Sequence, residues 1–303
     1  MEIDDVRRVV VVGAGTMGQQ IGFQCAGHGF EVTLYDNSST ALESAWDRID
    51  AYAQQLVDGG VITAEARDAA RARITATTNP STAAGEADLL SEAIPEDPKL
   101  KGRVLAEFNA LCPERTIFMT NTSTLLPSQF AKASGRPDRV IALHFHLPVW
   151  TTNLADVMPH QGTRPEVTAL VVQFARRIGQ VPIELHREHH GYVFNAMYTA
   201  VNREAITMAE QGVASIEDID RSWMRVTGTP VGPFGALDAV GIDTAWKITE
   251  YWAKRLIWVR QLRRNARFLK AYVDRGEVGI KTGKGFYSYP DPTYARPGFI
   301  DGT

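Results

Sequence analysis

The first half of the chain alternates short apolar runs with longer amphipathic stretches. Strand-length apolar runs lie at residues 9–12, 31–36, 87–92, 116–120, 139–144, 153–158 and 181–185. Helical patterns at about 40–58, 63–73, 98–111, 126–134 and 165–178 lie between many of these runs. Regular alternation of strands and helices is typical of an α/β fold with a doubly wound, mostly parallel sheet.

The second half of the chain has a different pattern. Residues 192–211 form one long helical pattern that Gly212 closes, and Ser215-Ile-Glu-Asp218 is a capping box that begins another helix. The apolar run at 285–289 is too short and isolated to define a sheet. We therefore expect two domains, residues 1–187 with the sheet and residues 188–303 all-helical. The tryptophans of the helical part fill either its core or a subunit interface.

A glycine-rich turn, Gly13-Ala-Gly-Thr-Met-Gly18, follows the first strand. Gly13 permits the tight turn, Gly15 lets the backbone approach a pyrophosphate, and Gly18 lets the next helix pack on the sheet. That helix begins around Thr16 and Met17, where unpaired N–H groups attract phosphate. The alternative interpretation is an ordinary strand–turn–helix unit whose glycines are incidental. In this context we expect a Rossmann-type dinucleotide-binding domain.

An acidic residue ends the second strand. Asp36 stands where a carboxylate accepts hydrogen bonds from ribose hydroxyls and repels a 2′-phosphate. The residues that follow it supply no arginine of the kind that NADP sites use. The sequence therefore predicts NAD as the cofactor.

Charge and cysteine content narrow the class of protein. The net charge is −3, from 32 basic and 35 acidic residues, and this balance does not indicate a basic surface that binds nucleic acid. Only two cysteines occur, which fits a reducing compartment. No apolar run reaches the roughly 18 residues of a membrane span, and the acidic start is unlike a signal peptide. We expect a cytoplasmic protein that acts on a small molecule, without membrane or nucleic acid.

A cofactor that accepts hydride needs a base for the hydroxyl proton. His144 ends a strand, and Asp156 lies in the following strand, where a carboxylate fixes an imidazole tautomer. From spacing alone, a structural histidine with an unrelated aspartate is the simpler interpretation. His144 and His146 share a strand face, which suits zinc, but no third ligand has a suggestive spacing. We therefore expect no metal site.

Several motifs, taken together, resemble the L-3-hydroxyacyl-CoA dehydrogenase family over nearly the whole chain. The motifs are Gly13-Ala-Gly-Thr-Met-Gly18, Glu92-Ala-Ile-Pro-Glu96, Asn121-Thr-Ser123, His144-Phe-His-Leu-Pro148, Gly191-Tyr-Val-Phe-Asn195, Gly232-Pro-Phe-Gly235 and Thr282-Gly-Lys-Gly-Phe-Tyr287. Their order and spacing are far more specific than any single motif. The resemblance makes the catalytic interpretation of His144 the favoured one.

The resemblance implies a role for each matching catalytic residue. His144 is the general base that removes the 3-hydroxyl proton, and Asp156 falls where the family has the glutamate that pairs with this histidine. Ser123 would hydrogen-bond the substrate oxygen near the nicotinamide. Asn195 would bind the thioester carbonyl or the reacting oxygen. Loop or helix capping is the alternative for Ser123 and Asn195.

Three further residues match positions around the cofactor. Glu96 and Lys101 line the ribose and its surroundings, and Asn121 lies in the adjacent motif. The implied activity is NAD-dependent oxidation of a 3-hydroxyacyl thioester to the 3-oxoacyl product, by a homodimer. Two alternatives stay open: a dehydrogenase of a free 3-hydroxy acid, of sugar-acid or carnitine type, and a non-catalytic NAD-binding relative.

The chain departs from the family pattern near the base. His-Phe-His-Leu-Pro stands where the family usually has His-Phe-Phe-Asn-Pro, so Leu147 cannot make the hydrogen bonds of asparagine. Asp156 is one methylene shorter than the usual glutamate. Because a shift of about 1 Å in a catalytic group can cost roughly 100-fold in rate, either the strands compensate or the substrate and activity have diverged.

Overall fold

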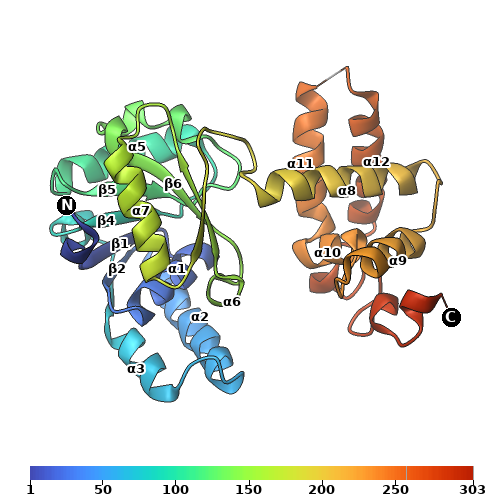
Figure 1. Cartoon of the computed structure of the whole chain (residues 1–303), viewed down its shortest axis with the longest axis horizontal. Helices are drawn as coiled ribbons and strands as arrows, with labels where there is room; N and C mark the ends of the chain where they lie inside the picture. Colours follow the sequence, from blue (N-terminus) through green and yellow to red (C-terminus); the bar gives the residue numbers. More distant parts are fainter. Residues whose placement is uncertain (257, 303) are drawn as a thin grey trace. The chain divides into compact units, whose positions relative to one another are not determined.

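The computed structural model describes residues 1–256 and 258–302. The chain divides into two compact units, Met1–Val193 and Phe194–Thr303, and each is described by itself (Figure 1).

The N-terminal unit contains one sheet in the order β3-β2-β1-β4-β5-β6-β7-β8. Its strands are β1 Arg8–Val12, β2 Glu31–Tyr35, β3 Ile74–Thr77, β4 Leu89–Glu92, β5 Ile117–Thr120, β6 Val140–Phe145, β7 Leu154–Pro159 and β8 Val181–Glu184. Every neighbouring pair is parallel except β6 and β7, which are antiparallel. This arrangement confirms the doubly wound sheet, and the strand order reverses direction at β1.

Helices cover both faces of this sheet (Figure 1). They are α1 Thr16–Gly27, α2 Ser39–Asp58, α3 Ala64–Ala72, α4 Pro80–Ala84, α5 Pro98–Leu111, α6 Val149–Thr152 and α7 Pro165–Arg177. Val9 and Val11 pack in one core with α1, α2 and α7, whereas Val10 and Val12 pack in the other with α4 and α5. Burial on both faces explains why β1 is an unbroken run of valines.

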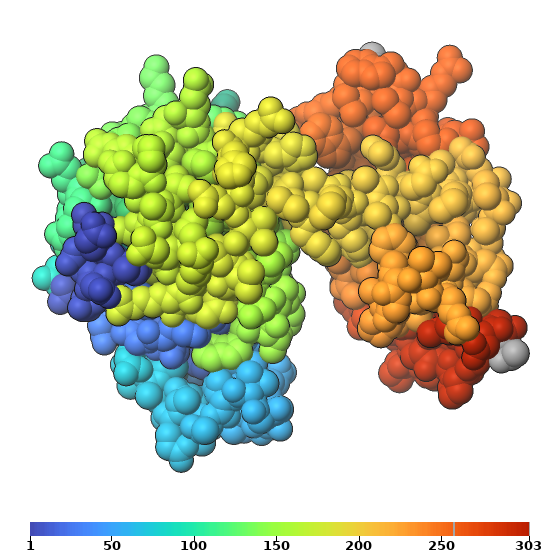
Figure 2. All heavy atoms as spheres, in the orientation of Figure 1, coloured from blue at the N-terminus to red at the C-terminus, as the bar shows by residue number. Residues whose placement is uncertain are grey.

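Local capping fixes where several of these helices begin. The Ser38 hydroxyl accepts the N–H of Ala41 at the start of α2, and the Asp97 carboxylate accepts the N–H of Leu100 at the start of α5. Pro98 then occupies the first position of α5. The α2 and α3 helices form a lobe of the N-terminal unit, in light blue in Figure 2.

Two local expectations differ from the structure. Residues 126–134 form two 3₁₀ turns, Pro127–Gln129 and Lys132–Ser134, because the N–H groups of Phe130 and Gly135 bond three residues back to Pro127 and Lys132. The strand β3 has no counterpart in the predicted pattern. It is a four-residue edge strand of sequence ITAT, too short and too polar to stand out from its surroundings.

The C-terminal unit is helical, as expected. Its helices are α8 Phe194–Glu210, α9 Ile216–Thr227, α10 Pro233–Val240, α11 Ile242–Arg255 and α12 Arg260–Asp274. The Ser215 hydroxyl accepts the N–H of Asp218, which confirms the predicted start of α9. Residues 279–288 contribute two isolated bridges rather than a strand. Within the described residues, no helix combines the length and apolarity that crossing a membrane requires.

Two buried carboxylates hold the C-terminal segment on this helical unit. Asp238 of α10 accepts the N–H groups of Phe286 and Tyr287, each at 2.9 Å, and the hydroxyl of Tyr289 at 3.0 Å. Asp220 of α9 accepts the hydroxyl of Tyr287 at 2.9 Å. Burial raises the pKa of both carboxyls. The acids tie the segment around Phe286 to two helices.

We expect Asp238→Ala to lower the free energy of unfolding by about 2–4 kcal/mol, because one buried and one partly buried N–H group lose their acceptor. Asp291→Ala is the matched control, since that carboxylate is exposed. Thermal unfolding followed by circular dichroism measures both. Equal melting temperatures for the two variants would contradict this account of the segment.

Candidate active site

The glycine-rich turn lies between β1 and α1. Gly13 has φ +108°, and its N–H donates to the carbonyl of Tyr35 at 2.8 Å. A Cβ at Gly18 would lie 1.8 Å from the carbonyl oxygen of Gly13, so only glycine permits this packing. At Gly15, by contrast, no described atom outside its chain neighbours lies within 4 Å of the position of a Cβ. The turn is closed toward the sheet and open at Gly15, which fits a bound pyrophosphate.

Asp36 follows β2 and contacts the glycine-rich turn. Its carboxylate accepts the N–H of Ala14 at 2.9 Å and that of Ser38 at 3.0 Å. The acid therefore stands beside the glycine-rich backbone, and its contact with a ribose stays a prediction. Arg48, which the sequence reasoning missed, donates from α2 to the carbonyl of Ala14 at 3.2 Å. The predicted contacts Thr16 and Met17 are the first two residues of α1.

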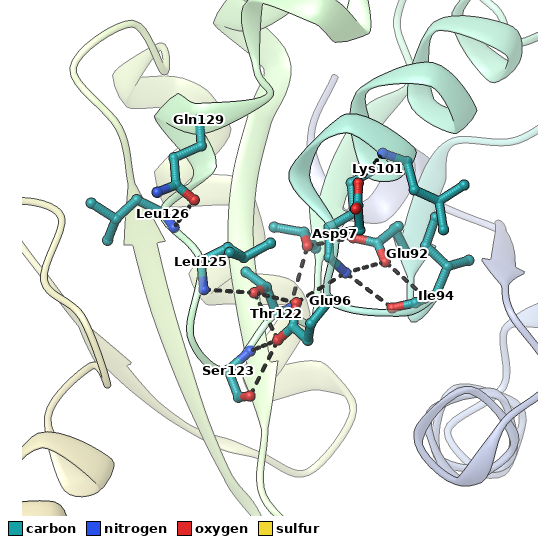
Figure 3. A network of polar contacts seen from close by, with 12 residues as sticks. Glu92, Ile94, Glu96, Asp97, Lys101, Thr122, Ser123, Leu125, Leu126 and Gln129 are labelled. Atoms are coloured by element: carbon teal, nitrogen blue, oxygen red, sulfur yellow. Dashed lines mark hydrogen bonds and ion pairs between the residues drawn. The ribbon is translucent and has the colours of Figure 1, made fainter. Parts of the chain in front are cut away.

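A buried ion pair links Glu92, at the end of β4, to Lys101 of α5 (Figure 3). The Lys101 ammonium lies 2.6 Å from a carboxylate oxygen of Glu92 and 3.4 Å from one of Glu96, and its side chain is 1 % exposed. Burial raises the pKa of Glu92. In this structure Lys101 therefore holds two carboxylates in place, and its predicted contact with a cofactor stays a prediction.

Glu96 organises the segment after β5. Its carboxylate accepts the hydroxyl of Thr122 at 2.7 Å, the N–H of Ser123 at 2.7 Å and the hydroxyl of Ser123 at 3.2 Å (Figure 3). Asn121 accepts the N–H of Phe145 at 2.9 Å through its side-chain oxygen. These contacts place Ser123 and Asn121 at the carboxyl ends of β5 and β6, where open α/β sheets bind ligands.

His144 and Asp156 are direct partners across the antiparallel pair β6–β7. The His144 Nδ1 atom lies 3.2 Å from Oδ2 of Asp156, and the side chains are 6 % and 0 % exposed. The structure thus brings together the two residues that the sequence predicts as base and orienting acid.

Two further side chains surround this pair. The Nε2 atom of His146 lies 2.9 Å from the same Oδ2 atom of Asp156. Tyr192 stacks on His144 with ring centroids 4.6 Å apart and 7° between the planes, and its hydroxyl donates to the carbonyl of Thr122 at 2.5 Å. The sequence reasoning missed the role of Tyr192, although the residue lies inside a recognised motif.

The surroundings decide the charge of the imidazole. Burial lowers the pKa of His144 below its usual value, and the hydrogen bond that His144 donates to Asp156 only partly opposes this. Burial also tends to raise the pKa of Asp156, but hydrogen bonds from His144 and His146 bring it below the usual value. The arrangement is therefore a neutral imidazole beside an ionised carboxylate, which is the charge state that a general base needs.

Asn195 lies in the first turn of α8, in the C-terminal unit. Its place in the site stays a prediction, since the two units are described separately. All other predicted site residues belong to the N-terminal unit, in or near the glycine-rich turn, at the ends of β2 and β4 to β6, in the first turn of α5 and in β7.

Family models cover most of the chain. Residues 8–189 match the model described as "3-hydroxyacyl-CoA dehydrogenase, NAD binding domain", and residues 191–289 match the C-terminal domain of the same family. The chain belongs to the 3-hydroxyacyl-CoA dehydrogenase family. The family's NAD-binding domain also supports NAD as the cofactor of the N-terminal unit.

Individual relatives agree with this membership. A probable 3-hydroxyacyl-CoA dehydrogenase of Caenorhabditis elegans is 32% identical over 95% of this chain and 97% of its own length. A fatty acid oxidation complex subunit alpha of a Shewanella species is 36% identical over 94% of this chain, which spans only 39% of that relative. A solved diketoreductase, described as acting on dicarbonyl compounds, is 40% identical with a TM-score of 0.87, over 94% of this chain and 99% of its own.

The carboxylate of Asp36 should set the preference between the two nicotinamide cofactors. We expect Asp36→Asn to reduce the ratio of NADH to NADPH affinity by about 10-fold, because the amide keeps an acceptor but neither bonds ribose as strongly nor repels a 2′-phosphate. Fluorescence titration of both cofactors measures this ratio. Asp47→Asn, an exposed acid of α2, is the control and should leave the ratio unchanged. An unchanged ratio in Asp36→Asn would remove the residue from the cofactor site.

Proposed function

We propose that this chain is an NAD-dependent dehydrogenase that reversibly oxidises a 3-hydroxyacyl-CoA thioester to the 3-oxoacyl product. The observation that carries the proposal is the buried contact of His144 with Asp156. Membership of the family and the probable dehydrogenase from C. elegans support the substrate class. The open turn at Gly15 supports the cofactor.

The bound NAD would supply the hydride acceptor, held by the glycine-rich turn and Asp36. Asp156 holds the proton of His144 on Nδ1, so that Nε2 carries the lone pair that takes the hydroxyl proton. The stack of Tyr192 restricts rotation of the imidazole ring. Once Nε2 is protonated, the carboxylate of Asp156 stabilises the imidazolium. In this proposal His144 acts as the general base and Asp156 as the acid that orients it.

Two residues are proposed as substrate contacts. Ser123, whose N–H stays on Glu96, would turn its hydroxyl from Glu96 to donate to the reacting oxygen. Asn195 would bind the thioester carbonyl or the same oxygen from the first turn of α8. Fixed donors of this kind stabilise negative charge that develops on oxygen in either direction of the reaction.

Replacing the base tests the proposal most directly. We expect His144→Asn to lower kcat with a 3-hydroxyacyl-CoA substrate by roughly 100- to 10,000-fold, because no group is left to take the proton. NADH absorbance measures the rate, and fluorescence titration should give unchanged NADH affinity. His186→Asn, at an exposed histidine of the same unit, should keep full activity. Full activity of His144→Asn would refute the assignment.

A second candidate function is reduction of a free dicarbonyl compound or oxidation of a free 3-hydroxy acid. The solved diketoreductase supports it, because at 40% identity and a TM-score of 0.87 it covers 94% of this chain. A panel of acyl-CoA thioesters, free 3-hydroxy acids and diketones separates the candidates. Turnover of the free compounds alone would reject the thioester. NADH binding without turnover of any substrate would instead support a non-catalytic relative.

We also infer a homodimer in the cytoplasm. Ile248 and Tyr251 expose apolar surface on α11, and Trp258, shortly after that helix, is 73 % exposed. Exposed aromatic side chains of this kind are typical of protein interfaces. The two cysteines, Cys25 and Cys112, are both buried free thiols, which fits a reducing compartment.

Light scattering after size exclusion tests the dimer. We expect about twice the chain mass of 33.4 kDa, and the single-chain mass for the double variant Tyr251→Glu, Trp258→Glu, because buried charges weaken an apolar contact. Val226→Glu, at an exposed valine of α9, is the control and should leave the dimer intact. A monomeric unmodified chain would overturn the inference.

A further inference from the structure

Two imidazoles converge on one carboxylate in the N-terminal unit. Nδ1 of His144 and Nε2 of His146 lie 3.2 Å and 2.9 Å from the same Oδ2 atom of Asp156. All three atoms lie within 4.8 Å of one another. The convergence follows from the strands: His144 and His146 are two residues apart at the end of β6, and Asp156 faces His144 from β7.

These distances suit one metal ion. A tetrahedral ion with bonds of about 2.1 Å separates its ligand atoms by roughly 3.4 Å, so small side-chain adjustments would place the three atoms around a single centre. Two imidazole nitrogens and a carboxylate are ligands that Zn²⁺, Co²⁺ and related ions accept, whereas Mg²⁺ and Ca²⁺ prefer oxygen. The spacing of residues along the chain does not reveal Asp156 as the third ligand, because it belongs to the neighbouring strand β7.

The carboxylate has an unused oxygen. Among the residues that the structure describes, Asp156 Oδ1 is buried and has no hydrogen-bond partner. A buried carboxylate oxygen is seldom left in this state. The atom belongs to the same carboxylate that both imidazoles contact, and its lone pairs are not used by any hydrogen bond among the described residues.

The geometry points to a divalent transition-metal site formed by His144, His146 and Asp156, whose occupancy blocks the catalytic base. Coordination through Nδ1 moves the ring proton of His144 to Nε2, so the nitrogen that would take the substrate proton is already protonated. The ring proton of His146 moves from Nε2 to Nδ1 in the same way. No proton is released in the exchange. The inhibition rests on the proposed dehydrogenase function, whereas the metal site does not.

Binding is tested without any substrate. The full chain, free of affinity tags and stripped of metal, is titrated with Co²⁺, and its visible absorption reports the coordination. We expect one ion per chain, displaced by Zn²⁺ and not by Mg²⁺. His146→Phe and Asp156→Asn should each weaken binding by at least about 10-fold, since each removes or weakens a ligand. His186→Phe, at an exposed histidine of the same unit, should bind as the unmodified chain does.

Circular dichroism confirms that each variant is folded, and Asp156→Asn keeps the test valid if His146→Phe does not fold. Absence of stoichiometric Co²⁺ binding would overturn the site. Equal affinity in the unmodified chain, His146→Phe and Asp156→Asn would also overturn it.

Activity tests the second half of the proposal. With 3-hydroxyacyl-CoA and NAD, Zn²⁺ should abolish turnover of the unmodified chain, and a chelator should restore it. His146→Phe, compared with its own metal-free rate, should lose at least about 10-fold less activity at the same Zn²⁺ concentration. Stoichiometric binding without inhibition would reject the blocking role. Metal binding in a chain that turns over no substrate would leave the site standing and refute the dehydrogenase.

Discussion

The antiparallel pairing of β6 with β7 is the constraint on which the site depends. It places Asp156 directly opposite His144, at the spacing where cross-strand side chains touch. The neighbouring residues Leu143, Phe145 and Val157 point to the opposite face, into the main hydrophobic core. Because a slip of one residue would exchange the faces, the core that fixes the register also fixes the His–Asp contact.

A second network links this pair to the segment that follows β5. Tyr192 stacks on His144 and donates to the carbonyl of Thr122. The hydroxyl of Thr122 donates to Glu96, which Lys101 in turn approaches. His144 is thus connected, through the buried Tyr192 and Thr122 and the exposed Glu96, to the segments that follow β5 and β4. For the proposed role of His144 as a base, precise placement matters, since small displacements of catalytic groups cost large factors in rate.

Much of this architecture is visible in the sequence, because its signals are local. The valine run of β1, the glycine-rich turn and the cap at Ser215 each specify their structure within a few residues. The sequence reasoning missed β3, whose four residues gain their conformation by pairing with β2 at the edge of the sheet. It also replaced two 3₁₀ turns with one helix, because the periodicity of apolar residues does not distinguish such short helical forms.

In the candidate site, too, some features are predictable from local sequence and others depend on contacts between separate elements. Strand ends near His144 and Ser123 are predictable, because carboxyl ends of parallel strands gather at one edge. The contact of His146 with Asp156 and the stack of Tyr192 on His144 are not, because each depends on side-chain directions across separate elements. Spacing along the chain indicates which residues form such a cluster, but it does not show that both histidines contact the same oxygen of Asp156.

Two of the departures from the family pattern, at positions 146 and 156, meet at one carboxylate. The chain has aspartate where the family usually has glutamate, and a histidine in place of a phenylalanine two residues after His144. The shorter acid still reaches His144, at 3.2 Å, because the register places it directly opposite. His146 holds the same oxygen from the side, at 2.9 Å, and so restrains a side chain that has one fewer rotatable bond than glutamate. The loss of a methylene is therefore offset by strand pairing and a second imidazole, and that second imidazole is also what gives the carboxylate two nitrogen neighbours instead of one.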